Sequence, residues 1–168
     1  MALKKTSEVI VIGANVTESA PNTFTQARID LQLNPLDNEV FVVQSINMDV
    51  QAPDAQAGVD SASRLSLTTT SQTAIAGLAS SNTLARKNLN IQAAGFVDGG
   101  VSFVETFGDT PPSMLDYIGI ISTNDFFLQI QGVANINALG GSCKMYGYRA
   151  RADAATYAAL VQSEVLSS

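Results

Sequence analysis

The chain has 168 residues, of which 46% are hydrophobic and only 14% charged, and its net charge is −6. Because it contains no histidine, Ser-His-Asp and Cys-His catalytic sites and histidine metal centres are excluded. Its single cysteine, Cys143, excludes an intrachain disulfide and a cysteine-based zinc site, and the residue is expected to act as a small buried hydrophobe.

The first third of the chain predicts three strands. Residues 7–13, SEVIVIG, are rich in β-branched side chains and end at a glycine. Residues 24–33 alternate as a half-buried strand does, with an apolar face made of Ala27, Ile29, Leu31 and Leu33. Residues 39–50 alternate again, with an apolar face made of Val40, Val42, Ile46, Met48 and Val50. The polar turn at 34–38 between the last two strands predicts an antiparallel hairpin.

The middle of the chain is less regular. Residues 51–62 are expected to form a loop, and 63–79 to hold a strand around Leu65 and Leu67, with a second around Ile75 left open. Residues 80–87 are ambiguous. A strand is predicted at 88–96, a turn at Asp98-Gly99-Gly100, and a strand at 101–107.

Two prolines keep the loop at 108–113 out of regular structure. Strands are then predicted at 114–122, 125–134 and 142–152. The whole gives eight to ten strands that do not alternate with helices, and the sequence has no fixed-period repeat. These features favour one all-β domain over 1–168, an antiparallel β-sandwich or barrel, with an N-terminal arm or strand at 1–20.

The tail, 153–168, predicts a short C-terminal helix. Asp153 can cap it, and one side is apolar: Ala154, Tyr157, Ala158, Val161 and Val165. About three turns of helix are not stable alone, so the helix must dock. Its own sandwich and a neighbouring subunit are equally good candidates.

Sequence patterns for chemistry are weak. Gly13 follows a strand, but the other glycines of a dinucleotide-binding turn are missing. Six loop aspartates could in principle serve glycoside hydrolysis or bind Ca²⁺, but their spacing favours turn formation: Asp54, Asp60, Asp98, Asp109, Asp116 and Asp125. No basic run exceeds two residues, so direct binding of nucleic acid is not indicated. No stretch is long enough to span a membrane. We expect no enzyme activity and no cofactor or metal.

The last strand carries Tyr146 and Tyr148 on one face, with Cys143, Met145 and Gly147 on the other. Arg149 and Arg151 follow on the face opposite the tyrosines and could pair with acids of a neighbour. Low charge and a mean hydropathy of +0.16 favour burial of surface between subunits over a neutral exposed surface.

Three stretches resemble single jelly-roll capsid proteins of small tailless icosahedral viruses: residues 22–55, residues 64–74, and residues 141–162, GSCKMYGYRARADAATYAALVQ. The closing strand with its Tyr/Arg-rich end, followed by a short helix, carries most weight. The resemblance implies eight strands in two four-stranded sheets, many copies per shell, a virion location after synthesis in the host cytoplasm, and no cofactor. Many such proteins carry a basic N-terminal arm, of which this chain has only Lys4 and Lys5.

The function we predict is therefore that of a self-assembling capsid subunit whose partners are copies of itself, with a second capsid protein as a further candidate partner. A phage tail-tube or decoration protein, and a carbohydrate-binding β-sandwich, are the alternatives. The expected inter-subunit contacts are Tyr146, Tyr148, Arg149, Arg151, Tyr157, Leu160 and Val161.

Overall fold

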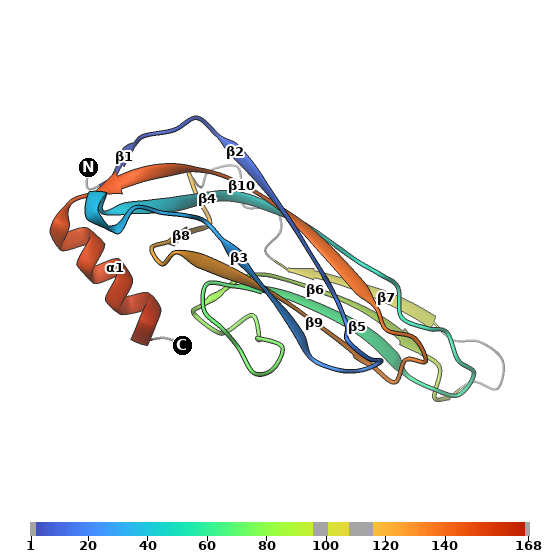
Figure 1. Cartoon of the computed structure of the whole chain (residues 1–168). Coiled ribbons are helices and arrows are strands. Elements are labelled where there is room, and N and C mark those ends of the chain that lie inside the picture. Colours follow the sequence, from blue (N-terminus) through green and yellow to red (C-terminus); the bar gives the residue numbers. More distant parts are fainter. Residues whose placement is uncertain (1–2, 96–100, 108–115, 167–168) are drawn as a thin grey trace.

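Two antiparallel sheets enclose the core of the protein. The computed structural model describes residues 3–95, 101–107 and 116–166. Sheet 1 contains β1 (Leu3–Lys5), β2 (Ile10–Thr17), β4 (Glu39–Val50), β8 (Gly119–Ile121) and β10 (Gly140–Ala152). Sheet 2 contains β3 (Thr25–Asp30), β5 (Ser61–Thr68), β6 (Thr83–Gln92), β7 (Val101–Phe107) and β9 (Asp125–Val133). A 3-10 turn, η1 (Pro35–Asp37), precedes β4, and α1 (Ala154–Leu166) ends the chain (Figure 1). The prediction of an all-β chain with a C-terminal helix is confirmed.

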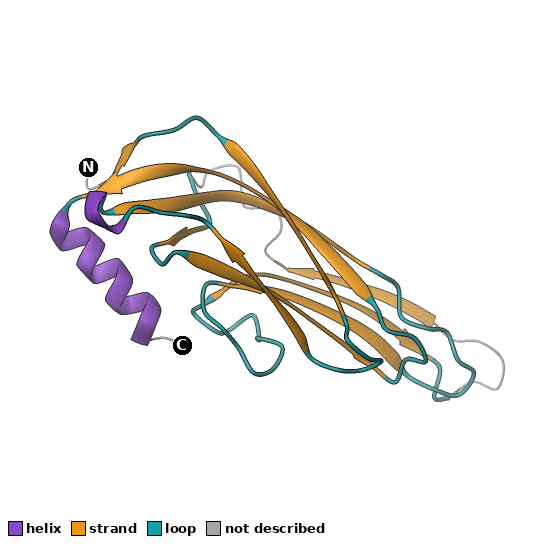
Figure 2. Ribbon diagram, in the orientation of Figure 1, coloured by secondary structure: helices purple, strands orange, loops and turns teal. Residues whose placement is uncertain are grey.

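The strands pair from the outside of the chain inward. β2 pairs with β10, β3 with β9, β4 with β8, and β5 with β6. Two further pairings, β10 with β4 and β5 with β9, join these four pairs into the two sheets, while β1 and β7 add to the edges at β10 and β6. Figure 2 shows the resulting two layers of strands with α1 at one end.

Alternating side chains from both sheets fill the space between them. Phe41, Ile46 and Met145 come from sheet 1, and Leu65 and Phe126 from sheet 2, and all five are fully buried. The apolar face predicted for residues 24–33 packs on this core, although β3 itself ends at Asp30. Gln32, two residues beyond the end of β3, adopts the left-handed region with φ of 53°, so the extended backbone does not continue to Leu33.

The apolar face predicted for residues 39–50 is wrong in its first half. Tyr146 and Gly147 of β10 lie opposite Ser45 and Val43, so Gln44 is an extra residue in β4. Such a bulge reverses which side chains face inward. Phe41 and Val43 therefore join Ile46 in the main core, and Val40 and Val42 lie on the other face of sheet 1.

The hairpin predicted for 24–33 and 39–50 is also wrong. The turn at 34–38 exists as η1, but the strands it connects belong to different sheets. Both edges of β4 pair with other strands, β10 and β8. The short connection therefore crosses from sheet 2 to sheet 1, which strand alternation alone cannot distinguish from a hairpin.

Several boundaries differ from the predicted ones. β2 begins at Ile10 and continues beyond Gly13 to Thr17, and β6 already begins at Thr83, within the ambiguous segment. β8 is only three residues long, and no strand forms around Ile75 in the described stretch 69–82. β7 has the predicted bounds. The turn predicted at 98–100 and the loop predicted at 108–113 lie outside the described residues.

The C-terminal helix begins as predicted but is rotated. The Asp153 carboxylate accepts a hydrogen bond from the Thr156 N–H at 2.7 Å, which makes it the N-cap. The side that faces the protein contains Tyr157, Leu160, Val161 and Glu164. Ala154, Ala158 and Val165 of the predicted apolar side are exposed, so that prediction is correct only for Tyr157 and Val161.

Candidate interaction surfaces

The helix α1, the turn η1 and residues 122–124 between β8 and β9 form one end of the sandwich, which we name the helix end (Figure 1). The bulge in β4 directs Val40 and Val42 toward a second hydrophobic cluster here. Its fully buried members are Val40, Val42 and Ala150, and Leu3, Ile120, Tyr148, Tyr157 and Leu160 pack around them. α1 thus docks on its own sandwich, one of the two placements that the sequence left open.

A buried carboxylate fixes the last turn of α1. Glu164 is 8% exposed and accepts hydrogen bonds from the Ser122 N–H at 2.9 Å and from the Ser122 hydroxyl at 2.6 Å. Its other oxygen accepts from the Thr123 hydroxyl. These bonds satisfy the carboxylate and set the rotation of the helix, since Glu164 must face the turn after β8. Helical periodicity gave no signal for this role.

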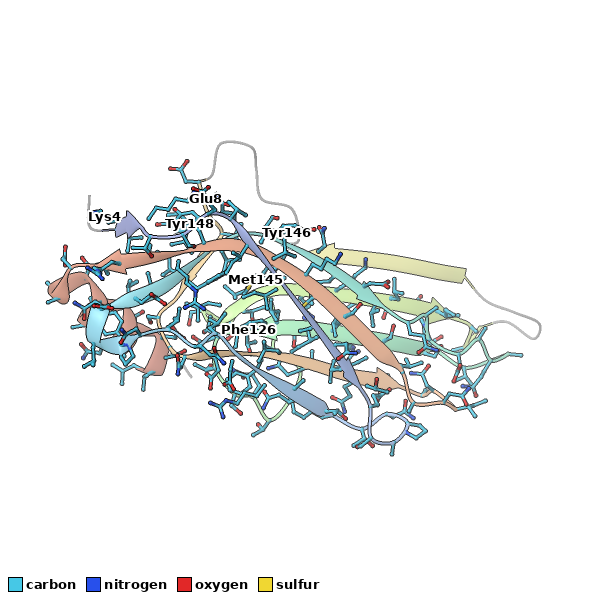
Figure 3. All side chains as sticks on the ribbon, turned by 45° about the horizontal axis from the view of Figure 1, so that its top comes forward. Lys4, Glu8, Phe126, Met145, Tyr146 and Tyr148 are labelled. Carbon is cyan, nitrogen blue, oxygen red and sulfur yellow. The ribbon has the colours of Figure 1, made fainter. Side chains whose placement is uncertain are left out.

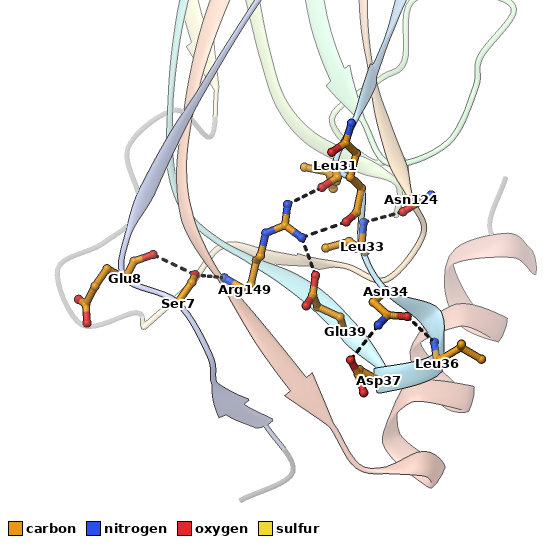
Figure 4. Close-up of polar contacts among 11 residues, drawn as sticks. Ser7, Glu8, Leu31, Leu33, Asn34, Leu36, Asp37, Glu39, Asn124 and Arg149 are labelled. Atoms are coloured by element: carbon orange, nitrogen blue, oxygen red, sulfur yellow. Dashed lines mark hydrogen bonds and ion pairs between the residues drawn. The ribbon is translucent and has the colours of Figure 1, made fainter.

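Arg149 joins three segments of the helix end (Figure 4). Its guanidinium forms an ion pair with Glu39 at 2.5 Å and donates to the carbonyls of Leu31 and Gln32, at 2.7 and 3.1 Å. Its backbone N–H donates to the Ser7 hydroxyl at 2.9 Å. The predicted pairing with a neighbour's acid is thus met within the chain, and Arg149 ties β10 to β4 and to the connection after β3.

Arg151 lies closer to the surface. It pairs with Asp37 of η1 at 3.3 Å, and both side chains are about half exposed, at 57% and 50%. Exposed pairs of this kind contribute about 0–1 kcal/mol. Arg151 therefore remains available to a second chain in a way that Arg149 does not.

The two tyrosines of β10 lie on the outer face of sheet 1, away from Met145 and Phe126 (Figure 3). Tyr148 belongs to the cluster beneath α1, and the Lys5 ammonium lies 5.1 Å from its ring centre, a cation–π distance. Tyr146 is half-buried and lies two residues before Tyr148 in β10, farther from the helix end. Of the seven predicted contact residues, the structure brings Tyr148, Tyr157 and Leu160 into one cluster, with Val161 beside it; a contact of these residues with another copy stays a prediction.

The opposite end, which we name the loop end, consists of the connections at residues 18–24, 51–60 and 134–139. Glu18, 4% exposed, accepts from the backbone N–H groups of Gly132 and Leu139 at 3.0 and 2.9 Å. Asn135 bonds to Asn22, to Ala62 and to the N–H of Asp54. This polar network ties the three connections together, and the sequence analysis missed it because the partners lie far apart along the chain.

Two of the aspartates that were predicted in loops, Asp54 and Asp60, accept hydrogen bonds from backbone N–H groups. Asp54 accepts from Ile136 and Asn137, which keeps the pKa of its carboxyl below the ordinary value, mainly through Asn137. Asp60 accepts from Ala93 and Ala94. Asp125 pairs with Arg28 at 2.6 Å and raises the pKa of that guanidinium. Asp54 and Asp60 thus join segments that lie far apart in the sequence, and the role of the loop aspartates as local turn formers stays a prediction. Asp98 and Asp109 lie outside the described residues.

Part of the neutral polar composition is used inside the protein. Gln129 is fully buried, accepts from the Ser66 hydroxyl at 2.8 Å and donates to Thr68 and Gln26 at 2.7 and 2.9 Å. Residues 70–72 close over this network through Gln72, whose N–H donates to Gln26 at 2.9 Å. The neutral polar side chains that accompany the low charge are thus used for hydrogen bonds inside the protein as well as on its surface.

Cys143 is buried, as predicted, and burial raises the pKa of its thiol to about 11. Within the described residues, no three Asp, Glu, Cys or His side chains gather as a metal site would require. No helix in the described part of the chain is long and apolar enough to cross a bilayer. Comparison with protein-family models, with curated proteins and with solved structures found no match to the chain.

Proposed function

We propose that the chain is a structural subunit that assembles with copies of itself, and that it is the single jelly-roll protein of a viral capsid. The inward-nested order of the strand pairs supports the jelly-roll part of the proposal. Winding one long hairpin into two sheets pairs the first strand with the last, and so on to the middle, as β2–β10, β3–β9, β4–β8 and β5–β6 do here.

The observation that carries the assembly part is the exposed apolar surface that η1 and α1 present at the helix end. Leu36 is 92% exposed and Leu166 74%. Of the thirteen residues of α1, all within the described part of the chain, only Glu164 is charged, and it is buried. The exposed side of a helix is normally charged or polar, whereas the centres of protein interfaces are depleted of charge.

The jelly roll also occurs in lectins, and a fold does not determine a function. The exposed apolar surface of the helix end favours assembly over glycan binding, because a glycan-binding module has no need to bury such a surface. A glycan-binding module remains monomeric, and its melting temperature rises with ligand.

Light scattering after size exclusion, with negative-stain microscopy of the same fractions, tests the proposal. Closed particles of many subunits are expected. Stacked rings would show that the subunits form a tube and not a closed shell. A monomer of 17.6 kDa at high concentration and at several salt concentrations would overturn self-assembly, and a glycan-binding screen would follow.

A further inference from the structure

The turn η1 presents a leucine to solvent in a fixed position. The Asn34 side chain accepts a hydrogen bond from the Leu36 N–H at 3.1 Å and donates to Asp37 at 2.8 Å (Figure 4). Asn38 adopts the left-handed conformation, with φ of 52°, and closes the turn. Leu36 is the most exposed large hydrophobic residue in the described chain, at 92%, and its burial would cost little conformational entropy in the backbone, because the turn is already ordered.

A pocket of about 230 Å³ adjoins this turn. Its apolar wall is formed by Leu33, Pro35, Tyr157 and Val161, and its polar wall by Ser122, Thr123 and Asn124. An engineered apolar cavity of about 150 Å³ in a protein core binds benzene, so this pocket has room for one leucine side chain. Leu36 does not fill it within its own chain, because Leu36 is almost fully exposed.

The exposed Leu36 side chain lies beside the pocket, and this arrangement suits a twofold contact. In such a contact the same patch is used on both subunits, so it must be complementary to itself. When Leu36 of one copy enters the pocket of another, the twofold axis places the second Leu36 at the first pocket.

The charges of this end favour a second copy as the partner. A chain of net charge −6 repels its copies, so contact is least costly where charge is absent or balanced. α1 presents no charged side chain to solvent along its described length. At the base of the turn, Asp37 and Arg151 supply one charge of each sign, and across a twofold axis each can face its opposite on the other copy.

We propose that two copies pair through the helix end about a twofold axis, with Leu36 of each copy in the pocket lined by Leu33, Pro35, Tyr157 and Val161 of the other. This inference rests on the proposed self-assembly and names the partner and the contact for that surface. The predicted contact residues Arg151, Tyr157 and Val161 then lie in or beside the interface.

Substitution L36D tests the contact against a matched control. A buried leucine contributes enough that its replacement by a charge should weaken pairing on the order of 100-fold, while the thermal unfolding of the monomer stays unchanged. Ile136 is also exposed, at 66%, but lies at the loop end, so I136D should pair and assemble like the wild type. L36M keeps an apolar knob and should restore pairing.

Crosslinking gives an independent readout. Chains carrying L36C and differently sized chains carrying V161C are mixed and treated with a short bismaleimide reagent. Cys143 is buried and holds its proton, with a pKa of about 11, so it does not compete for the reagent. A heterodimeric product is expected from this mixture and not from one of I136C with V161C.

The outcomes separate this inference from the proposed function. Wild-type particles together with unchanged particles from L36D, or absence of the specific crosslink, would overturn the twofold contact and leave self-assembly standing. A wild-type chain that stays monomeric and does not crosslink would overturn both.

Discussion

Both ends of the sandwich are closed by a buried carboxylate, but the two carboxylates bind different donors. In the described structure, Glu18 at the loop end accepts hydrogen bonds from two backbone N–H groups, those of Gly132 and Leu139. Glu164 at the helix end accepts from one N–H and from the hydroxyls of Ser122 and Thr123.

The difference distinguishes the two sheets, which we call the framework, from α1, which docks on them. The backbone N–H groups at the loop end are fixed by the sheets and cannot rotate toward water. They therefore require Glu18 as their hydrogen-bond acceptor whenever the sheets are formed. The hydroxyls at the helix end can rotate toward water. Because α1 packs on the sandwich and belongs to neither sheet, it can loosen without disturbing the strands. A substitution at the loop end should therefore lower the free energy of global unfolding, and a substitution at the helix end should promote local opening of α1.

Substitution E18A should have the largest effect. It leaves two buried N–H groups without an acceptor, each costing about 1–3 kcal/mol, so the free energy of unfolding should fall by about 3–4 kcal/mol. Urea unfolding measures it. E18Q keeps one acceptor oxygen and should lose about half as much. A loss below about 1 kcal/mol for E18A would show that water or a rearranged loop supplies the acceptor.

Substitution G147A should come next. A Cβ at Gly147 would lie 2.3 Å from the Val42 carbonyl and 2.6 Å from the Phe41 ring. The bulge in β4 must shift to relieve this contact, at a cost of about 2–3 kcal/mol, and the cluster beneath α1 shifts with it. G13A is the matched control, because a Cβ there meets nothing within 4 Å; equal stabilities of the two variants would contradict the assignment.

The same bulge shows where sequence analysis stops. Alternation predicted β4 with its correct bounds, because a strand buried on one face alternates apolar and polar side chains. It could not predict that Gln44 is extra, since a bulge depends on the partner strand. Val40 and Val42 were therefore assigned to the wrong face, and the cluster that receives α1 was invisible.

Local chemistry was predictable for the same reason that distant partners were not. Asp153 was recognised as a helix cap because capping depends on residues within one turn. The hydrogen bonds of Glu18, Glu164 and Arg149 join residues that lie from 41 to 142 positions apart. Only the strand order, which alternation does not encode, brings them together.

Substitution E164A should have a smaller and local effect. Loss of the acceptor leaves one buried N–H, that of Ser122, unsatisfied and should cost about 1–2 kcal/mol. Amide hydrogen exchange should show faster exchange in α1 and unchanged protection in β5 and β9. Q162A, at an exposed position of the same helix, is the control. Equal loss of protection in all strands would mean that α1 belongs to the framework.

The smallest effect is the pH dependence of the helix start. The N–H of Thr156 donates to Asp153 and holds the pKa of its carboxyl below the ordinary value of 3.8. Because folding lowers this pKa, its stabilisation is complete above the unfolded value and is lost as the pH falls through the folded value. Amide exchange in the first turn of α1 should therefore accelerate, beyond its intrinsic pH dependence, as the pH falls below the ordinary value of 3.8. In D153N the cap persists, since Asn also caps well, but it does not titrate. The variant should lack this added pH dependence. Identical pH profiles for the two chains would mean that the cap does not stabilise the first turn of α1.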